Sequence, residues 1–386
     1  MPLPKVDKIK FWGDFEKPLE QYRLEFLEKL STIILNCEEC KQYSDLIAFA
    51  FFCRKKNLGK LLSLSKLSGF SLGIGTVFHI TPKNIPMNFA LSFIFGYLSG
   101  NSNIVKAPIS LYHQARLFVK IWKDLENREN IRTVNLFLDF DREDTELDLF
   151  IKKSDAILVW GGDETIRKIN SYERKPNAIF WSFPDRFSIS VIDSQKFNSS
   201  DNKRKLRMCH DFFNDSLIVD QNACSSPSAI FWLGKENESD LARKFFWESF
   251  NKFKYDVGPV EKIDRAILMN KLIKNNKVEM SDRNWTDSFL NILFKNPEEI
   301  DLRKIRGKFG IFLETKISDL KELSFIFDQK LQTVAIYGVE EVLIKELIVN
   351  EKLSGCDRIV PIGRALDFSL TWDGRDSLQV LTRKIF

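Results

Sequence analysis

The feature that most constrains the fold is a regular alternation of strand-like and helix-like segments between Gly73 and Trp160. Short apolar runs predict strands at 73–80, 104–106, 133–138 and 155–160, and longer segments predict helices at 87–98, 112–125 and 144–152. Strands that alternate with helices in this way pair in parallel. The sequence therefore predicts a doubly wound α/β sheet in this part of the chain.

The remainder of the chain is organised less regularly. Apolar residues at helical spacing before residue 70 predict a helical arm, and Phe183-Pro184-Asp185 is the expected joint between domains. A length of 386 residues fits two domains and an added arm. Around and beyond the joint we expect strands at 178–182, 187–193, 228–233, 307–313 and 332–337, helices at 202–216, 238–255, 264–274 and 340–353, and a polar loop at 275–284.

Composition and charge exclude several kinds of partner. The formal charge of +5, from 58 basic and 53 acidic residues, is spread over a large surface, so we expect no nucleic acid, whereas phosphorylated small ligands are compatible with it. Segment 87–98 is shorter than the roughly 20 residues of a membrane span and is interrupted by polar residues, so it predicts a buried helix. Residues 1–7 lack the apolar core of a signal peptide, which predicts a cytoplasmic protein.

Six cysteines occur, at positions 37, 40, 53, 209, 224 and 356. Cys37 and Cys40 have the Cys-x-x-Cys spacing of zinc and redox sites, but the chain offers no second pair, and the flanking sequence is helical. We therefore expect neither a metal site nor a redox site, and thiols in place of disulfides.

Cys224 lies in the small-residue stretch Asn222-Ala223-Cys224-Ser225-Ser226, between a predicted helix and a predicted strand. A cysteine at such a turn is held rigidly and can still be reached, as a nucleophile must be. The alternative is that Cys224 is a buried small hydrophobe, the commonest state of a cysteine without a disulfide.

Gly161 and Gly162 mark a second candidate, where a predicted strand gives way to a helix. Glycines allow backbone N–H groups to approach a pyrophosphate, and a helix N-terminus favours negative charge. The alternative is an ordinary turn between a strand and a helix.

Together these motifs resemble the LuxC-type acyl-CoA reductases, the fatty-acid reductases of bacterial luminescence systems, within the aldehyde dehydrogenase superfamily. The likeness covers roughly residues 70 to 386 and rests on separate blocks in the family's order. These blocks are 79–86 with 100–106, then 155–164, then 221–227, and finally 356–363 with 372–374.

The resemblance implies an aldehyde dehydrogenase-like α/β fold. It implies a helical arm at 1–70, a Rossmann-like dinucleotide-binding domain at 71–184, a catalytic domain at 185–375 and a C-terminal helix at 376–386. The implied partners are an acyl-CoA or acyl-carrier substrate, an acyl-protein synthetase and a second copy of the chain. No nucleic acid and no membrane span are expected.

The resemblance also implies roles for two catalytic residues. Cys224 matches the family nucleophile, whose thiolate attacks the thioester carbonyl, expels CoA and holds the acyl group. Asn84 matches the asparagine that forms the oxyanion hole with the Cys224 backbone N–H. Judged without the family, Asn84 is better explained as a loop residue that caps the helix beginning near Pro86.

The cofactor implied is NADPH. Lys106 matches the lysine that the superfamily places on the adenosine ribose, and residues 107–110 contain no acid to repel a 2′-phosphate. Without the family, Lys106 is equally a surface lysine. Gly161 and Gly162 would lie against the pyrophosphate with Thr165 nearby, and Thr81 and Pro82 would also contact the cofactor.

One absence is informative. Aldehyde dehydrogenases that produce acids carry a glutamate base on a Glu-Leu-Gly-Gly block, which here reads Trp181-Ser182-Phe183-Pro184. Without a carboxylate at this position, attack by water on the acyl-enzyme should be slow, so reduction to the aldehyde should prevail.

Other polar residues are weaker candidates. His79 and His210 are expected to be structural more often than catalytic, and Asp357 and Arg358 to pair with each other or with backbone. The 34 phenylalanines either line an acyl tunnel or reflect a bias in composition. Two other functions stay open, a reductase of acyl phosphates similar to glutamyl phosphate reductase and a non-catalytic binding member of the fold, although the presence of both Asn84 and Cys224 argues against the latter.

Overall fold

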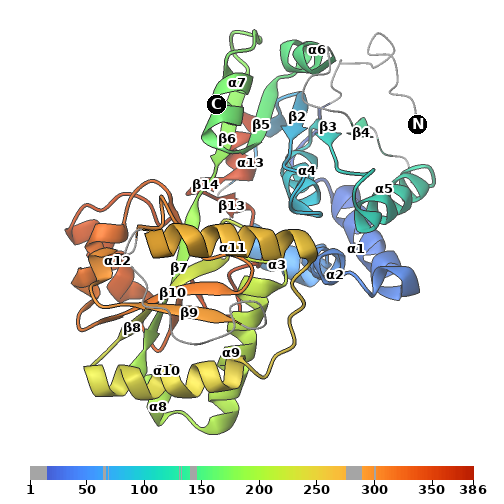
Figure 1. The fold of residues 1–386 in the computed structure, drawn as a ribbon. Coiled ribbons are helices and arrows are strands. Elements are labelled where there is room, and N and C mark those ends of the chain that lie inside the picture. Colours follow the sequence, from blue (N-terminus) through green and yellow to red (C-terminus); the bar gives the residue numbers. More distant parts are fainter. Residues whose placement is uncertain are drawn as a thin grey trace. The chain divides into compact units, whose positions relative to one another are not determined.

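The computed structural model describes residues 15–63, 67, 69–129, 131, 133–139, 146–274, 289–299 and 301–386. The chain forms two compact units (Figure 1). Unit 1 comprises Met1–Asp185 and Phe368–Phe386, and unit 2 comprises Arg186–Asp367. The loop expected at 275–284 and the first residues of the helix expected at 144–152 lie outside the described residues.

Unit 1 is built on a five-stranded parallel sheet with the order β4-β3-β2-β5-β6. The chain runs outward from β2 through β3 to β4 and then returns to β5 on the other side of β2, so β2 and β5 flank the topological switch point. This arrangement confirms the predicted doubly wound sheet. The strands are β2 (Thr76–Ile80), β3 (Ser102–Lys106), β4 (Asn135–Leu138), β5 (Ala156–Gly161) and β6 (Ile179–Pro184).

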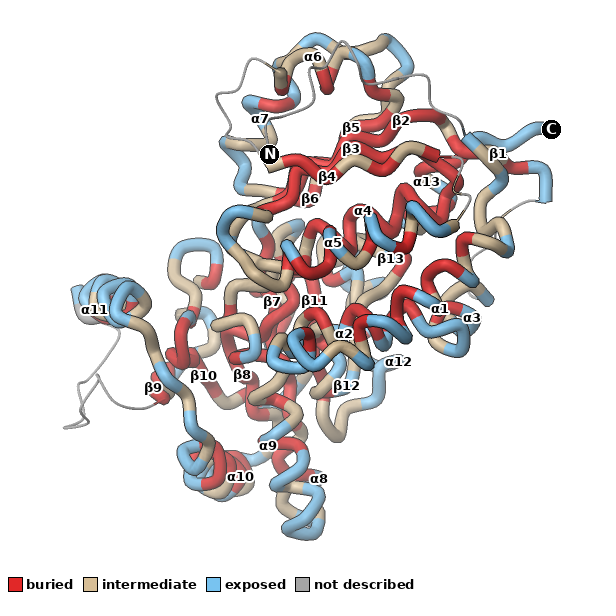
Figure 2. The backbone as a smooth tube through the Cα atoms, turned by 90° about the vertical axis from the view of Figure 1, so that its right-hand side faces the viewer, coloured by how far each residue is buried: buried red, intermediate tan, exposed pale blue. Residues whose placement is uncertain are grey.

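The helices of unit 1 cover both faces of this sheet, which explains why β2 and β3 are buried along their whole length (Figure 2). The helices of unit 1 that precede β6 are α1 (Gln21–Asn36), α2 (Ser44–Phe52), α3 (Lys55–Leu62), α4 (Asn88–Leu98), α5 (His113–Glu126), α6 (Glu146–Lys153) and α7 (Asp163–Asn170), with a short 3-10 helix, η2 (Glu38–Cys40).

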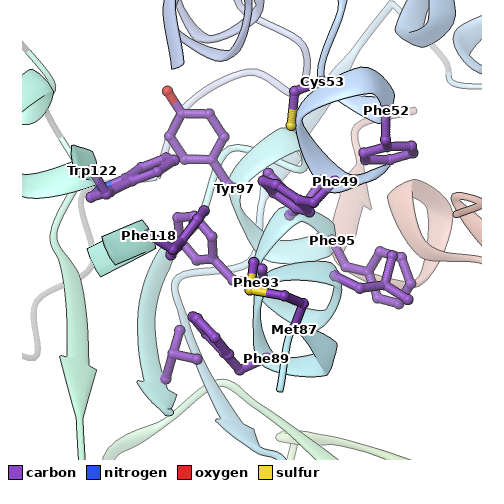
Figure 3. Close-up of a cluster of buried hydrophobic side chains, with 14 of the residues drawn as sticks. Phe49, Phe52, Cys53, Met87, Phe89, Phe93, Phe95, Tyr97, Phe118 and Trp122 are labelled. Atoms are coloured by element: carbon purple, nitrogen blue, oxygen red, sulfur yellow. The ribbon is translucent and has the colours of Figure 1, made fainter. Parts of the chain in front are cut away.

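Helix α4 is the centre of the unit 1 core. All its residues from Phe89 to Leu98 are buried, as its apolar character on every side predicts. Aromatic side chains from α4 and α5 pack edge to face around it, with the Phe93 and Trp122 ring centroids 4.6 Å apart (Figure 3). These phenylalanines therefore fill a packed core.

The first helices belong to this same core. Arg23 of α1 is fully buried and donates to the Tyr97 carbonyl at 2.7 Å and to Thr133 Oγ1 at 3.0 Å. An ion pair with Glu16 at 2.9 Å balances its charge. Helix α1 thus packs on α4 and α5 as part of unit 1.

The end of the chain differs from the single helix expected over 376–386. It forms β13 (Thr371–Trp372), β14 (Arg375–Asp376), the short helix α13 (Ser377–Val380) and β15 (Thr382–Lys384). Strand β15 pairs antiparallel with β1 (Ser71–Gly73), and Asn101 Nδ2 donates to the Leu381 carbonyl at 2.9 Å. These partners are some 300 residues away, so local sequence gives no sign of them.

Unit 2 contains a six-stranded parallel sheet with the order β12-β11-β7-β8-β10-β9. Its strands are β7 (Phe187–Asp193), β8 (Pro227–Leu233), β9 (Leu290–Phe294), β10 (Ile311–Ile317), β11 (Leu331–Tyr337) and β12 (Arg358–Pro361). Strand β10 begins after the position expected, because Gly310 (φ +83°) turns the chain just before it. The edge strands β9 and β12 have no counterpart among the predicted strands.

Helices pack against the unit 2 sheet, and most were predicted from the sequence. They are α8 (Ser194–Ser199), α9 (Asn202–Leu217), α10 (Glu236–Phe250), α11 (Pro259–Lys274) and α12 (Glu341–Asn350), with short 3-10 helices η3 (Pro297–Glu299) and η4 (Leu320–Ile326). Across the described ranges of both units, every helix is too short or too polar to cross a bilayer.

Candidate active site

The cofactor candidates of unit 1 meet at one edge of its sheet. Strand β2 lies between β3 and β5, and Ile80 is in register with both Lys106 and Val159. Thr81 therefore follows β2 between the carboxyl ends of the two neighbouring strands. Its Oγ1 donates to the Lys106 carbonyl at 2.5 Å, and Pro82, which is half-buried, follows it. Ligands of open parallel sheets bind at this edge, next to the switch point.

Lys106 is not the exposed surface lysine of the alternative interpretation. It is only 5% exposed at the end of β3. A lysine is seldom buried to this degree unless its ammonium group has partners. Its burial at the carboxyl edge of the sheet is consistent with a role in binding.

Sequence reasoning missed one acid near Lys106. Asp139 follows β4, the next strand beyond β3, and one of its carboxylate oxygens accepts a hydrogen bond from the Ser110 backbone N–H. Strand order could have revealed Asp139, because parallel pairing places the end of β4 alongside the end of β3.

Gly161 and Gly162 lie between β5 and α7, as predicted. A Cβ at Gly161 would stand 3.3 Å from the Thr165 side chain, so this position allows the strand to approach the helix closely. Gly162 is exposed, and a Cβ there would meet nothing within 4 Å. The exposed acids Asp163 and Glu164 occupy the first turn of α7 and oppose an anion at this helix end.

Asn84 lies in the turn that leads into α4 and is exposed. The N-cap of α4 is Met87, and no side chain caps it. The alternative reading of Asn84 as the cap of this helix is therefore wrong. It lies beyond the carboxyl end of β2, four residues after Ile80.

The two histidines named above occupy different environments. His79 is fully buried in β2, where its ring nitrogens lie 2.8 Å from Ser92 Oγ and 3.1 Å from Asn103 Oδ1. Burial lowers the pKa of His79 to about 4, so the imidazole is neutral at physiological pH and serves as a structural group. His210 is exposed on α9, and its Nδ1 lies 3.3 Å from Asn214 Nδ2.

In unit 2, Cys224 lies in the turn between α9 and β8, as the sequence predicts. It is partly exposed, which separates it from the buried thiols of Cys209 and Cys356. Burial raises the pKa of each of those two thiols to about 12 and keeps them protonated. Accessibility thus favours Cys224 as the reactive thiol of this unit.

Side chains from distant parts of unit 2 hold the turn that contains Cys224. Asp220 and Gln221 adopt positive φ angles of 53° and 56°, and Asp220 Oδ1 accepts a hydrogen bond from the Tyr255 hydroxyl at 2.7 Å. Gln221 Oε1 accepts from the Gly310 N–H at 2.8 Å, and its Nε2 donates to the Ile311 carbonyl at 3.3 Å. These hydrogen bonds therefore hold the strained backbone of the turn against the start of β10.

Asp215 joins this turn to the motif block at 356–363. Its carboxylate accepts hydrogen bonds from the backbone N–H groups of Gly363 at 2.6 Å and Ala365 at 2.9 Å. Its own carbonyl accepts a hydrogen bond from Ser226 Oγ at 2.8 Å. Burial raises the pKa of Asp215 to about 7, although the two amides oppose this shift. Two sequence blocks of the family thus meet at one buried aspartate, one at its backbone carbonyl and the other at its carboxylate.

Asp357 and Arg358 do not pair with each other. Asp357 forms an ion pair with Arg186 at 2.8 Å. The Arg358 guanidinium donates to three carbonyls of segment 364–367 at 2.8 to 2.9 Å, so it folds the loop that Asp215 binds. Pairing with backbone, the other option for Arg358, is confirmed.

Residues 181–184, where acid-producing aldehyde dehydrogenases are expected to carry their glutamate base, lie in β6. Trp181 and Phe183 point into the unit 1 core, where the Phe183 ring stacks on Trp160 with centroids 3.8 Å apart. The fully buried Glu314 of unit 2 does not replace that base. Its carboxylate accepts four hydrogen bonds, from the side chains of Trp232, Arg243, Trp247 and Asn291, and has a structural role.

The Cys-x-x-Cys pair lies at the junction of α1 and η2. Cys37 follows α1, and Cys40 is buried at the end of η2. Among the residues that the structure describes, no group of three or more histidine, cysteine or acidic side chains is arranged to hold a metal ion.

Comparison with solved structures identifies the fold. The chain superposes on aldehyde dehydrogenase 21 from Physcomitrella patens, solved with succinate, with a TM-score of 0.66 and 15% identity over 94% of this chain and 84% of that one. A lactaldehyde dehydrogenase gives a TM-score of 0.65 with 13% identity over 94% and 85%. The aldehyde dehydrogenase-like fold is therefore confirmed.

Comparison of sequences identifies the family. A long-chain acyl-protein thioester reductase of Aliivibrio fischeri is 24% identical over 334 residues, which are 80% of this chain and 63% of that relative. The chain thus spans less than two thirds of the length of the curated relative. The family model for acyl-CoA reductase (LuxC) matches residues 65–384. The chain belongs to the LuxC family of acyl-CoA reductases.

Proposed function

We propose that this protein reduces a long-chain acyl thioester to the aldehyde through an acyl group held on Cys224, with NADPH as the reductant. The single observation that carries the proposal is the partly exposed Cys224 in a turn fixed from several sides. Family membership and the aldehyde dehydrogenase-like fold support it. The acyl donor is a thioester of CoA, as the family description suggests, or of a protein, as the name of the Aliivibrio relative suggests.

In the first half-reaction, the Cys224 thiolate attacks the thioester carbonyl carbon. Negative charge develops on the carbonyl oxygen, and the Asn84 carboxamide and the Cys224 backbone N–H donate hydrogen bonds to it. The tetrahedral intermediate collapses, the carbon–sulfur bond of the donor breaks, and the departing thiolate takes up a proton. Cys224 then carries the acyl group as a new thioester.

In the second half-reaction, the acyl group on Cys224 is reduced. The carboxyl edge of the unit 1 sheet fits a dinucleotide, because a buried lysine, a threonine and a close-packed glycine turn lie at adjacent strand ends. NADPH, when bound there, supplies a hydride to the carbonyl carbon. Asn84 stabilises the oxyanion again, and the resulting thiohemiacetal on Cys224 collapses to release the aldehyde and the thiol.

Hydrolysis of the acyl-enzyme competes with reduction. The strand position at which acid-producing relatives carry a glutamate here presents only Trp, Ser, Phe and Pro side chains. No carboxylate from these four residues can activate water, so the acyl group should persist until it is reduced.

The decisive experiment follows the acyl group. Purified protein is incubated with radiolabelled hexadecanoyl-CoA, and label on the protein is measured before and after addition of NADPH. We expect label on Cys224 that is discharged as hexadecanal, no label in Cys224→Ala, and unchanged labelling in Cys209→Ala, a buried thiol on the preceding helix. Label retained by Cys224→Ala would contradict the covalent mechanism.

The same assay separates the acyl donors and the cofactors. A reductase of acyl phosphates would ignore the CoA ester and accept hexadecanoyl phosphate, whereas the proposed enzyme has the opposite preference. An acyl-carrier thioester tested in parallel shows whether CoA or a protein delivers the acyl group. NADPH and NADH are compared at equal concentration, because Lys106 favours a 2′-phosphate while Asp139 opposes it.

A further inference from the structure

Ser188 of β7 contacts the turn of Cys224 directly. The Ser188 hydroxyl donates to the Cys224 backbone carbonyl at 2.6 Å and accepts a hydrogen bond from the Thr333 N–H of β11 at 3.1 Å. Ser188 is fully buried. A serine hydroxyl has one proton to donate and can accept as well, so both contacts form at once.

The strands on both sides of Ser188 are irregular at this residue. On one side, Phe187 pairs with Leu331 and Ser188 with Thr333, so β11 contains an extra residue. On the other side, Ser188 pairs with Pro227 and Ile189 with Ala229, so β8 also contains an extra residue. Bulges are rare in parallel sheets and occur preferentially beside active sites, where they redirect a side chain.

These irregularities explain why the hydroxyl is needed. Pro227 has no backbone N–H, so it cannot donate to β7 at this point of the sheet. The Thr333 N–H binds the Ser188 side chain in place of a carbonyl of β7. The hydroxyl therefore accepts a backbone hydrogen bond of β11 and donates one to the Cys224 carbonyl in the turn that follows α9.

We propose that Ser188 is a positioning residue for the nucleophile: it fixes the Cys224 carbonyl against the central strands and so sets the direction of the Cys224 thiol. The inference rests on the proposed role of Cys224. Fixing this carbonyl restricts rotation about the Cα–C bond of Cys224. The residue then presents its sulfur and its backbone N–H in one orientation, as attack and oxyanion binding both require.

Ser188→Ala tests the proposal, and the same strand provides a matched control. Ser190 is two residues further along β7 on the same face, is fully buried, and its hydroxyl has no hydrogen-bond partner among the residues that the structure describes. Ser190→Ala therefore removes an equivalent buried hydroxyl without touching the turn. Ser188→Thr retains the hydroxyl and serves as the rescue variant.

Two measurements are made on the full chain. The first is hydrogen–deuterium exchange of peptides that cover residues 217–227, which does not depend on any activity. The second is the single-turnover rate at which excess hexadecanoyl-CoA acylates Cys224. We expect Ser188→Ala to exchange faster in 217–227 and to be acylated at least tenfold more slowly at saturating substrate. Ser190→Ala and Ser188→Thr should both resemble the unchanged protein.

The outcomes separate the two proposals. Equal exchange and equal acylation in Ser188→Ala and Ser190→Ala would overturn the role of Ser188. Failure of the unchanged protein to be acylated would overturn the proposed function, and exchange would still decide whether Ser188 holds the turn. If Ser188→Ala does not fold, Ser188→Thr decides alone, because increased exchange of 217–227 despite a retained hydroxyl contradicts the proposal.

Discussion

The two units hold their candidate residues in different ways. In unit 1, Thr81, Lys106 and Gly161 stand at or directly after the ends of adjacent parallel strands, so the sheet itself brings them together. In unit 2, Cys224 lies in a turn whose shape depends on hydrogen bonds with other elements, above all those of Ser188 and Gln221. Changes in unit 1 should therefore act locally, whereas changes around Cys224 should spread through the turn.

The difference has an energetic basis. A buried hydrogen bond contributes only about 1 kcal/mol net, but a buried partner left unsatisfied costs about 1–3 kcal/mol. The turn of Cys224 depends on several such bonds, and two of its residues have positive φ. Its geometry thus relies on distant partners, while the strand ends of unit 1 rely on backbone pairing.

The largest effect is expected from Cys224→Ala, which tests whether the turn of unit 2 carries the chemistry. The variant should lose at least about 10³-fold in aldehyde formation, because no nucleophile remains to accept the acyl group. Stability should change little, since the side chain is partly exposed. Rates are measured by aldehyde release and stability by urea unfolding. If Cys224→Ala formed aldehyde as fast as the unchanged protein, the turn of unit 2 would not carry the chemistry.

Asn84→Ala is expected to give the next largest effect and tests whether unit 1 supplies more than cofactor binding. Loss of one oxyanion donor should lower kcat by about 10²–10³-fold, or roughly 3–4 kcal/mol. Because Asn84 is exposed and does not cap α4, the unfolding free energy should stay within about 0.5 kcal/mol. Asn88→Ala, in the first turn of α4, is the control. A normal kcat in Asn84→Ala would show that Asn84 is a surface residue without a role in catalysis.

Asp215→Asn sharpens the comparison through pH. The folded pKa of Asp215 is about 7 against an ordinary value of 3.8, so the folded state favours the protonated carboxyl. The stability that this preference contributes is complete below about pH 4 and is lost as pH rises towards 7. The difference corresponds to a few kcal/mol, at about 1.4 kcal/mol per pKa unit.

Asparagine cannot ionise, so Asp215→Asn should become progressively more stable than the unchanged protein between about pH 4 and 7. Urea unfolding of both proteins at several pH values measures this difference. Asp211→Asn, one turn earlier on α9 and only partly buried, is the control. Parallel pH curves for Asp215→Asn and the unchanged protein would show that this carboxyl group titrates normally.

The sequence predicted what local patterns determine. The periodicity of residues 73–160 gave the strands and helices of unit 1, and the small residues around Cys224 gave its turn. It could not predict β15, because pairing of Leu72 with Arg383 depends on contact across the chain. Ser188 and Asp215 escaped notice for the same reason. Each is an ordinary polar residue whose importance lies in backbone groups 36 to 150 positions away.

The smallest effect is expected from Asp139→Asn, and it tests whether strand order in unit 1 sets cofactor preference. Asparagine keeps an oxygen that can accept the Ser110 N–H but removes the negative charge beside the segment after Lys106. The ratio of kcat/KM for NADPH to that for NADH should rise about two- to fivefold, because exposed charge interactions are worth about 1 kcal/mol or less. The difference in this ratio between Asp139→Asn and the unchanged protein should become smaller as salt is added, as expected for a screened charge. Asp163→Asn, at the start of α7, provides a control with the same loss of charge at another strand end.

If both variants shift the ratio equally, the net charge of the sheet edge is responsible. If only Asp139→Asn shifts it, the adenosine end of the cofactor lies between the ends of β3 and β4, and parallel pairing has brought into the site an acid that no motif reveals.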